Sequence, residues 1–255
     1  MIKILTIGNS FSDDTMEYVG HIAKSLGIEV FLGNLYIGGC SINTHANNLI
    51  GDTPAYEFRT FINGEWITQY GYKLADALQL KDWDYVCFQQ VSHQSGLEST
   101  FERLDELVLG VRAIVGNRAT FIWNMTWAYQ SDSAHTGFLN YNNDQQTMYS
   151  AIIQQVKNVI LCRDEFKVII PVGTAIQNAR TSILGDNLTR DGFHLNTQYG
   201  RYIASLTFLG ALTKADLSGV TYAPQGVSQS IKNVCIECAV NAITKPFEVT
   251  KSVFI

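Results

Sequence analysis

Three residues whose types suit nucleophilic acyl transfer lie in predicted loops near the two ends of the chain. Ser10 follows an apolar run that stops at Gly8, while Asp191 and His194 stand three residues apart in a polar stretch. An imidazole that acts as a general base needs an acceptor for its Nδ1–H, and Gly192 lets a short turn bring Asp191 to it. We predict Ser10 as nucleophile, His194 as base and Asp191 as its orienter; a capping aspartate with a structural histidine is the alternative.

A second serine, Ser12, lies close to Ser10. Ser12 precedes Asp13 and Asp14 at the start of an amphipathic pattern, a position that suits a helix N-cap followed by acidic residues favourable to the helix dipole. Ser10 instead lies in the turn between strand and helix, where its hydroxyl can face a crevice and its N–H can point at a developing oxyanion. We therefore interpret Ser12 and the two aspartates as helix-start residues.

Apolar runs of strand length alternate with amphipathic stretches of helix length. The runs are nearly continuous in apolar residues, as strands covered on both faces require, and they occupy residues 2–7, 28–37, 84–90, 119–125 and 166–172. Helices are expected at 13–26, 100–115, 144–161, 197–212 and 225–243. The order predicts an α/β fold with three layers (α/β/α) and a doubly wound parallel sheet of about five strands. Such sheets bind ligands at the carboxyl ends of their strands, where Ser10 lies.

One segment interrupts this alternation. Residues 57–70, EFRTFINGEWITQY, carry Asn63-Gly64 between two alternating runs, which is a strong signal for a β-hairpin. We expect this hairpin to be an insertion after the second strand, near the carboxyl edge of the sheet. The absence of a linker or repeat predicts a single domain over 1–255.

Composition narrows the class of protein. The 255 residues carry a net charge of −5 without a Lys/Arg cluster, which argues against a nucleic-acid partner. The sequence lacks an apolar span of about 20 residues, so no membrane span is expected. Cys235 and Cys238 have no second pair that would complete a zinc site, and we expect buried thiols. The opening MIKILTIG suits a strand, so we expect a cytoplasmic protein; a leader preceding this sequence would make it periplasmic or secreted.

Several stretches together resemble the SGNH (GDSL-like) hydrolase superfamily. GNSFS resembles its first block, YIGGCSI its second and LTRDGFHLN its fifth, and DYVCFQQVSHQSG falls where the third block stands. The stretches FQQVS, IWNMTWAY, PVGTAIQNAR and DGFHLNTQYGRYIA look closer still to a bacterial branch known mainly as a domain of unknown function, whose members are presumed esterases. The resemblance implies a flavodoxin-like SGNH hydrolase fold and a serine esterase with a Ser10–His194–Asp191 triad and no cofactor or metal.

The resemblance also implies an oxyanion hole, formed by the backbone N–H groups of Ser10 and Gly39, with Gly38 as the alternative to Gly39. The superfamily adds an Asn side chain from its third block, but Ser92 stands at that position here. We expect the amide of Gln89 or Gln90, or the Ser92 hydroxyl, to replace it, because losing one such donor typically costs about 10²–10³ in rate. Asn9 replaces the usual Asp of the first block, a change that we interpret as minor.

Polar and aromatic side chains near the predicted crevice suggest the substrate. The residues expected to contact it are His45, His93, Trp127 and Tyr129. They suit a small-molecule or glycan ester, with a short acyl group such as acetyl on a carbohydrate. One alternative is a non-catalytic carbohydrate-binding relative. Another is a metal-dependent phosphoesterase that uses His45, His93 and His194 with Asp13 or Asp14, although their spacing matches no ligand motif.

Overall fold

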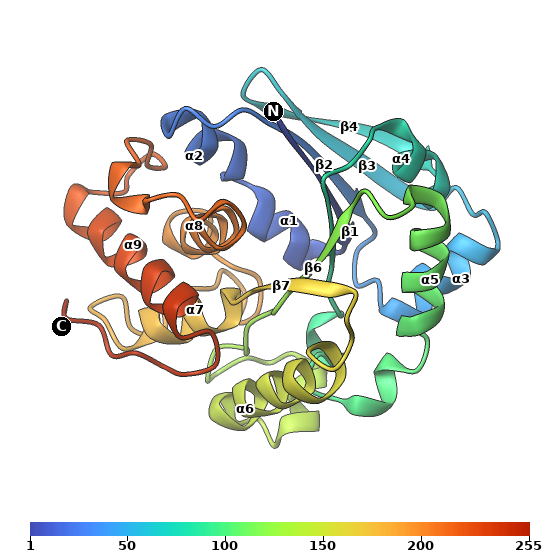
Figure 1. Cartoon of the computed structure of the whole chain (residues 1–255). Coiled ribbons are helices and arrows are strands. Elements are labelled where there is room, and N and C mark those ends of the chain that lie inside the picture. Colours follow the sequence, from blue (N-terminus) through green and yellow to red (C-terminus); the bar gives the residue numbers. More distant parts are fainter.

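The computed structural model describes residues 1–255, and a mixed sheet of seven strands runs through its centre (Figure 1). The strands are β1 (Ile2–Gly8), β2 (Val30–Tyr36), β3 (Tyr56–Ile62), β4 (Glu65–Tyr72), β5 (Tyr85–Phe88), β6 (Thr120–Asn124) and β7 (Phe166–Ile170). Their order across the sheet is β4-β3-β2-β1-β5-β6-β7. All five strands expected from the apolar runs are present, and these five are parallel to one another.

The order of the parallel strands explains why the end of β1 can hold a site. From β1 the chain proceeds to β2 on one side, and it later returns to β5 on the other side of β1. The loops that leave the ends of these strands therefore diverge, and a crevice forms at this switch point. Ser10 begins the first helix directly after β1, so the predicted nucleophile lies at the switch point.

The expected hairpin exists, but it is not an insertion outside the sheet. β3 and β4 pair across Asn63 and Gly64, which both have positive φ angles (55° and 95°), as tight hairpin turns require. β3 also pairs antiparallel with β2. The hairpin therefore extends the sheet to seven strands. Alternate side chains of β3, those of Tyr56 and Phe58, lie in the core.

Helices cover both faces of the sheet. They are α1 (Ser10–Met16), α2 (Val19–Ser25), α3 (Ile42–Ile50), α4 (Leu74–Leu80), α5 (Leu104–Val115), α6 (Gln145–Gln155), α7 (Val172–Arg180), α8 (Tyr199–Thr213) and α9 (Gln229–Thr244). Short 3₁₀ turns occupy Ser92–Gln94, Glu98–Phe101, Thr136–Tyr141 and Leu217–Gly219, and a π-helical turn, Val156–Ile160, continues α6. Figure 1 shows α1, α2, α7, α8 and α9 on one side of the sheet and α3, α4 and α5 on the other. The predicted three layers are present.

Two features differ from the helix pattern of the sequence. The helix expected at 13–26 is two helices, and Tyr18 between them donates its N–H to Ser205 of α8 at 3.1 Å. α3, α4 and α7 were not expected. The residues after α9 pack against α7 and α9. Thr250 N–H donates to the Asn178 side chain of α7, and Val253 N–H donates to the Glu237 side chain of α9.

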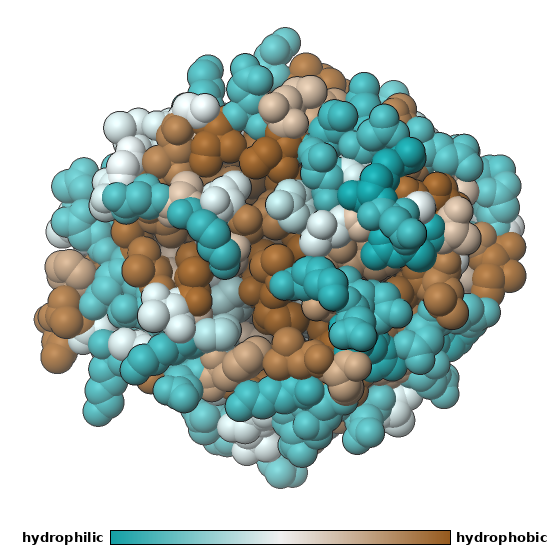
Figure 2. All heavy atoms as spheres, in the orientation of Figure 1, coloured by the Kyte–Doolittle hydropathy of each residue, from teal (hydrophilic) through white to brown (hydrophobic).

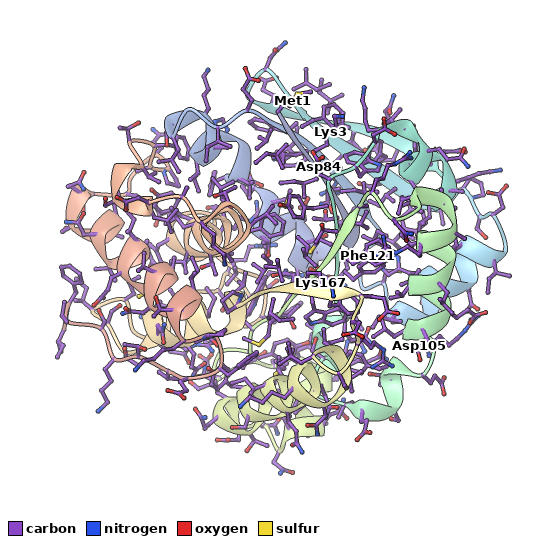
Figure 3. The ribbon with its side chains drawn as sticks, viewed as in Figure 1. Met1, Lys3, Asp84, Asp105, Phe121 and Lys167 are labelled. Carbon is purple, nitrogen blue, oxygen red and sulfur yellow. The ribbon has the colours of Figure 1, made fainter.

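A hydrogen bond joins the beginnings of β1 and β5. The backbone N–H of Lys3 donates to the Asp84 carboxylate at 2.7 Å, and both residues are labelled in Figure 3. Figure 2 shows hydrophilic residues around the outline of the face in view and apolar residues toward its middle. None of the helices combines the length and apolar character needed to cross a bilayer. Cys235 and Cys238 are buried free thiols in α9.

Candidate active site

The turn between β1 and α1 sets the position of Ser10. Asn9 is the N-cap of α1, because its Oδ1 accepts the N–H of Phe11 at 3.0 Å. Ser12 was therefore wrongly expected to cap the helix; it is buried one turn inside, where its hydroxyl donates to the Asn9 carbonyl at 2.7 Å. A side chain at Gly8 would come within 2.6 Å of the Ser12 hydroxyl, so this close turn requires glycine.

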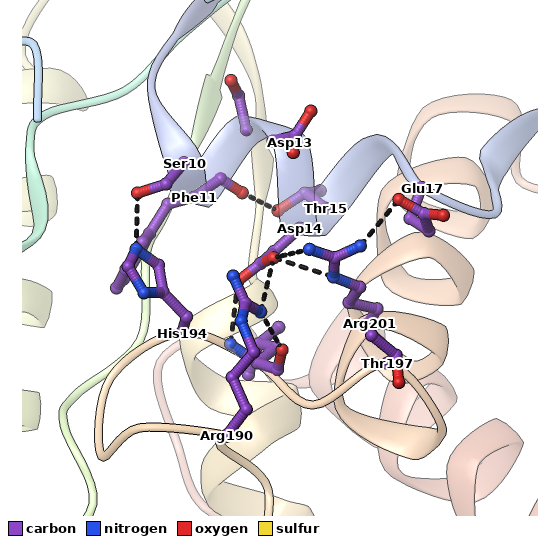
Figure 4. A network of polar contacts seen from close by, with 12 residues as sticks. Ser10, Phe11, Asp13, Asp14, Thr15, Glu17, Arg190, His194, Thr197 and Arg201 are labelled. Carbon is purple, nitrogen blue, oxygen red and sulfur yellow. Dashed lines mark hydrogen bonds and ion pairs between the residues drawn. The ribbon is translucent and has the colours of Figure 1, made fainter. Parts of the chain in front are cut away.

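The structure brings Ser10, His194 and Asp191 together. The Nε2 atom of His194 lies 2.8 Å from Ser10 Oγ, and its Nδ1 atom lies 2.6 Å from Asp191 Oδ2 (Figure 4). The three groups form a continuous chain from hydroxyl to imidazole to carboxylate. The side chains of His194 and Asp191 are 20% and 39% exposed, so the chain of contacts opens to solvent. This arrangement can transfer a proton from Ser10 to His194.

The Asp191–His194 turn is held by its own aspartate. Asp191 Oδ1 accepts the backbone N–H groups of Phe193 and His194, at 3.2 and 2.8 Å. Partial burial by itself would raise the pKa of Asp191, but the hydrogen bonds from the His194 ring and from these two N–H groups lower it below its usual value. Gly192 has a φ of +90° and lies against Ser133, so a larger residue would not fit.

Backbone N–H groups beside Ser10 are free to bind a ligand. Gly39 lies in an exposed turn after β2 with a φ of +64°. The N–H groups of Ser10 and Gly39 donate to no acceptor in the chain. Asn9 connects their two turns, because its Nδ2 donates to the carbonyl of Cys40 at 2.9 Å. The first-block asparagine therefore has a specific role that the sequence interpretation missed.

The structure contradicts the expected side-chain donors of an oxyanion hole. Gln89 is buried, and its Nε2 donates to Asn9 Oδ1 at 3.0 Å. Gln90 is buried too, and its Nε2 donates to the carbonyl and hydroxyl of Thr100, at 2.9 and 3.3 Å. Ser92 is also buried, with its hydroxyl 2.7 Å from that of Tyr129. All three side chains are therefore bonded within the protein.

His45 was expected to contact the substrate, but it is a core residue. It is only 1% exposed, and its Nδ1 lies 2.9 Å from the Tyr56 hydroxyl and 3.5 Å from Cys40 Sγ. Its Nε2 has no partner. Burial lowers the pKa of His45 to about 3, because a charged imidazole is costly in this apolar environment. The short helix α3 thus carries a buried neutral histidine.

Trp127 and Tyr129, also expected to contact the substrate, are fully buried. The Trp127 ring stacks on Phe11 with centroids 3.9 Å apart and planes at 5°. Its indole N–H donates to the Phe193 carbonyl at 2.8 Å. Trp127 therefore lies behind the site, between the residue after Ser10 and the residue before His194.

His93 is the one predicted substrate contact that remains partly exposed. Its ring lies beside that of His135, with centroids 5.8 Å apart and planes at 26°. The His135 ring also lies 4.7 Å from that of Phe193, next to the triad histidine. His135 was not predicted to belong to the site. Two imidazoles thus line the surface next to the Asp191–His194 turn.

Asp14 also has more than a helix-start role. Its carboxylate is completely buried and binds two guanidiniums, those of Arg190 and Arg201, and the N–H of Leu195. Burial raises the pKa of Asp14, while Arg201 and Arg190 act in the opposite direction. A second aspartate after a predicted nucleophile, together with an arginine next to Asp191, was the signal in the sequence for this contact.

The residues of the metal-dependent alternative do not come together. His45 is enclosed with Tyr56, and Asp14 is bound by arginines. The chain contains no group of three or more His, Cys, Asp or Glu side chains arranged to hold a metal ion. A hollow of about 1020 Å³ lies by α2, the start of β2 and the hairpin turn, and no residue of the triad lines it.

The fold by itself defines a structural class. The chain has the fold of the SGNH hydrolases: a proposed SGNH hydrolase from Slackia heliotrinireducens matches it with a TM-score of 0.53 and 20% identity, over 83% of this chain and 98% of that one. The protein TesA matches with a TM-score of 0.50 and 13% identity, again over 83% and 98%. At such identities the likeness shows the fold alone.

Within this class, the chain belongs to the DUF4886 family, a domain of unknown function whose profile matches residues 3–242. The crystal structure of a DUF4886 family protein from Bacteroides uniformis matches with a TM-score of 0.95 and 40% identity, over 98% of this chain and 97% of that one. The chain matches none of the curated proteins with which it was compared. The likeness to the Bacteroides protein therefore covers nearly the whole chain.

Proposed function

We propose that the protein is a serine esterase that cleaves short-chain esters through an acyl-enzyme. The observation that carries this proposal is the unbroken chain of contacts from Ser10 through His194 to Asp191, at 2.8 and 2.6 Å. The switch point of an SGNH hydrolase fold is where such a group would meet a ligand. The low pKa of Asp191 keeps its carboxylate charged beside the imidazole at neutral pH.

The mechanism follows from these positions. His194 Nε2 takes the Ser10 proton while Oγ attacks the ester carbonyl, and Asp191 stabilises the imidazolium that forms. The N–H groups of Ser10 and Gly39 receive the negative oxygen of the tetrahedral intermediate. His194 then gives its proton to the leaving alcohol. Water, deprotonated by His194, attacks the acyl-enzyme and releases the acid, which restores Ser10.

The surroundings favour a short acyl group on a polar alcohol such as a carbohydrate. Since the triad opens to solvent and none of its residues lines the hollow by α2, a long acyl chain would have little apolar surface to cover it. His135 Nδ1 accepts the N–H of Gly137 at 2.9 Å, so the neutral ring carries its proton on Nε2. Burial, then the nearby His93, lowers the pKa of His135 and keeps it neutral. His93 and His135 thus offer polar ring atoms to hydroxyl groups.

A serine-directed fluorophosphonate tests the proposal. We expect it to label the protein at Ser10, as located by mass spectrometry of the digested protein, and we expect p-nitrophenyl acetate to be hydrolysed faster than the octanoate. The Ser10→Ala variant should fold normally and lose both reactions, whereas EDTA should change neither. Labelling elsewhere, or turnover that survives in Ser10→Ala, would remove the proposed nucleophile.

The same experiment separates the non-catalytic alternative. Only the altered third block favours it, because Gln90 and Ser92 do not replace the superfamily's asparagine. A carbohydrate-binding relative would bind sugars, measured by calorimetry, without fluorophosphonate labelling and without ester hydrolysis. We expect labelling, because two backbone N–H donors remain free beside Ser10.

A further inference from the structure

The segment that carries Asp191 and His194 has little regular structure of its own. Between α7 and α8 the chain forms one isolated bridge, from Thr189 to Leu195, and no helix or strand includes Asp191 or His194. Ser10 by contrast begins a helix that is packed against the sheet. Because a loop takes its shape from the contacts around it, something outside this segment must set its distance from Ser10.

Asp14 makes those contacts. It lies one helical turn after Ser10 on α1, and both of its carboxylate oxygens are used. Oδ2 accepts the N–H of Leu195 at 2.8 Å, and Oδ1 lies 3.0 Å from Arg190 Nη1. The same Nη1 of Arg190 donates to the Leu195 carbonyl. Asp14, Arg190 and Leu195 therefore form a closed ring of contacts, and the two loop residues in it flank the Asp191–His194 pair (Figure 4).

Arg201 completes the arrangement from α8. Its Nε donates to Asp14 Oδ1 at 2.8 Å, and its Nη1 donates to Glu17 at 2.8 Å. Docking of α8 on α1 has contacts that do not involve the loop, because Arg201 also binds Glu17 and the Ser205 hydroxyl of α8 donates to the Thr15 carbonyl at 2.8 Å. A fully buried carboxylate is costly unless it is paired and hydrogen-bonded. The contacts of Asp14 to the loop thus serve something other than helix docking.

We propose that Asp14 is a positioning residue that holds the Asp191–His194 segment in register with Ser10, an inference that rests on the proposed serine esterase. Asp14 touches neither substrate nor the reacting atoms. It acts through Leu195 and Arg190, and it keeps Nε2 of His194 within proton-transfer distance of Oγ. Loss of this hold lets the imidazole drift, and a misplacement of about 1 Å can cost about 10² in rate.

Three variants test this proposal. Asp14→Asn replaces the charged acceptor of the Leu195 N–H with a weaker amide oxygen and leaves Arg190 without its counter-charge. Arg190→Gln removes the guanidinium from the partly exposed loop side, away from the folded core. Glu17→Gln is the matched control, because it removes the other carboxylate on Arg201 and leaves the loop contacts intact. We expect Asp14→Asn and Arg190→Gln to lose about 10² in kcat with KM nearly unchanged, and Glu17→Gln to stay within about threefold of the parent.

Two readouts distinguish positioning from folding. Thermal unfolding shows whether each variant is folded, and hydrogen exchange of the Leu195 amide reports the contact to Asp14 without any activity. Faster exchange in Asp14→Asn than in Glu17→Gln, together with the loss of kcat, supports the proposal. Equal kcat in folded Asp14→Asn and parent, or equal losses in Asp14→Asn and Glu17→Gln, overturns it.

Failure of the esterase would be visible separately. If the parent protein reacts with neither the fluorophosphonate nor the acetate ester, the proposed function falls. Hydrogen exchange then still decides whether Asp14 holds the loop: unchanged protection of the Leu195 amide in Asp14→Asn overturns the structural half of the proposal, and lost protection retains it.

Discussion

The side-chain amide of Asn9 donates to the backbone carbonyl of Cys40 at 2.9 Å, across 31 positions of sequence. Asn9 precedes the proposed nucleophile, and Cys40 follows the glycine that offers the second free N–H. Together with the bond from Ile37 N–H to the Gly8 carbonyl, this contact joins the turns that carry the two groups proposed to bind an oxyanion. Asn9 also caps α1 through its other amide atom, so it belongs to both turns at once.

Replacing Asn9 by Asp should separate these two roles. A carboxylate keeps the cap, because it still accepts the N–H of Phe11, but it has no N–H for the Cys40 carbonyl. We expect kcat to fall by up to about 10², since the Gly39 donor loses its fixed position, while fluorophosphonate labelling of Ser10 persists at a lower rate. Steady-state kinetics and labelling rates measure this; a variant with parent kcat contradicts it.

The carboxylate of Asp191 should keep the proton of neutral His194 on Nδ1. Asp191→Asn retains the shape of the turn but no longer requires the proton on Nδ1 of the imidazole. We expect kcat on p-nitrophenyl acetate to fall by about 10³–10⁴, with little change in thermal stability. The far-ultraviolet circular dichroism of the variant serves as its folding control. A loss below tenfold would show that Asp191 does not orient the base.

The buried His45 should make the protein sensitive to mild acid. Its folded-state pKa of about 3 lies below the usual value, so between these two values the unfolded chain binds a proton that the native state does not. Stability therefore falls as pH decreases, by about 2 kcal/mol from this group between pH 7 and pH 5. Urea unfolding at both pH values measures the effect. His45→Gln should show a smaller decrease than the parent, and parallel decreases would refute the assignment.

Replacing His135 should raise KM for ester substrates that carry hydroxyl groups more than for esters without them. If its Nε2–H binds the alcohol portion of a carbohydrate ester, His135→Ala should raise KM for an acetylated sugar by roughly fivefold to tenfold, the value of one hydrogen bond. p-Nitrophenyl acetate, which has no hydroxyl groups, is the matched control and should show almost no change. An equal effect on both substrates would indicate a change in the triad instead of a substrate contact.

The sequence predicted the parallel strands and the contact of Asp191 with His194, because both depend on strong local patterns. The contact of Ser10 with His194, 184 positions apart, was predicted from the place that both residues take at the carboxyl ends of the strands and from the family resemblance. Continuous apolar runs mark strands covered on both faces, and Asp191 reaches His194 within one turn. Three predicted substrate contacts were wrong for a common reason. His45, Trp127 and Tyr129 belong to types that bind ligands but also fill cores, and only tertiary packing decides between the two.

Long-range polar contacts were beyond sequence reasoning for a different reason. The amide of Gln90 reaches Thr100 and Ile42, and Asp14 reaches Leu195 across 181 positions. No periodicity records such pairs. The hairpin shows an intermediate case: Asn63-Gly64 predicts the turn correctly, but whether β3 joins the sheet depends on a free edge of β2, which the local pattern does not contain.

The distance along the chain between α1 and its partners has a consequence for biosynthesis. His194 lies 184 positions after Ser10, so the two groups that would exchange the proton remain apart until the chain has been synthesised past His194. A truncated product that stops before His194 would keep Ser10 yet lack the proposed base. Appearance of turnover would therefore report completed assembly of the molecule during its synthesis.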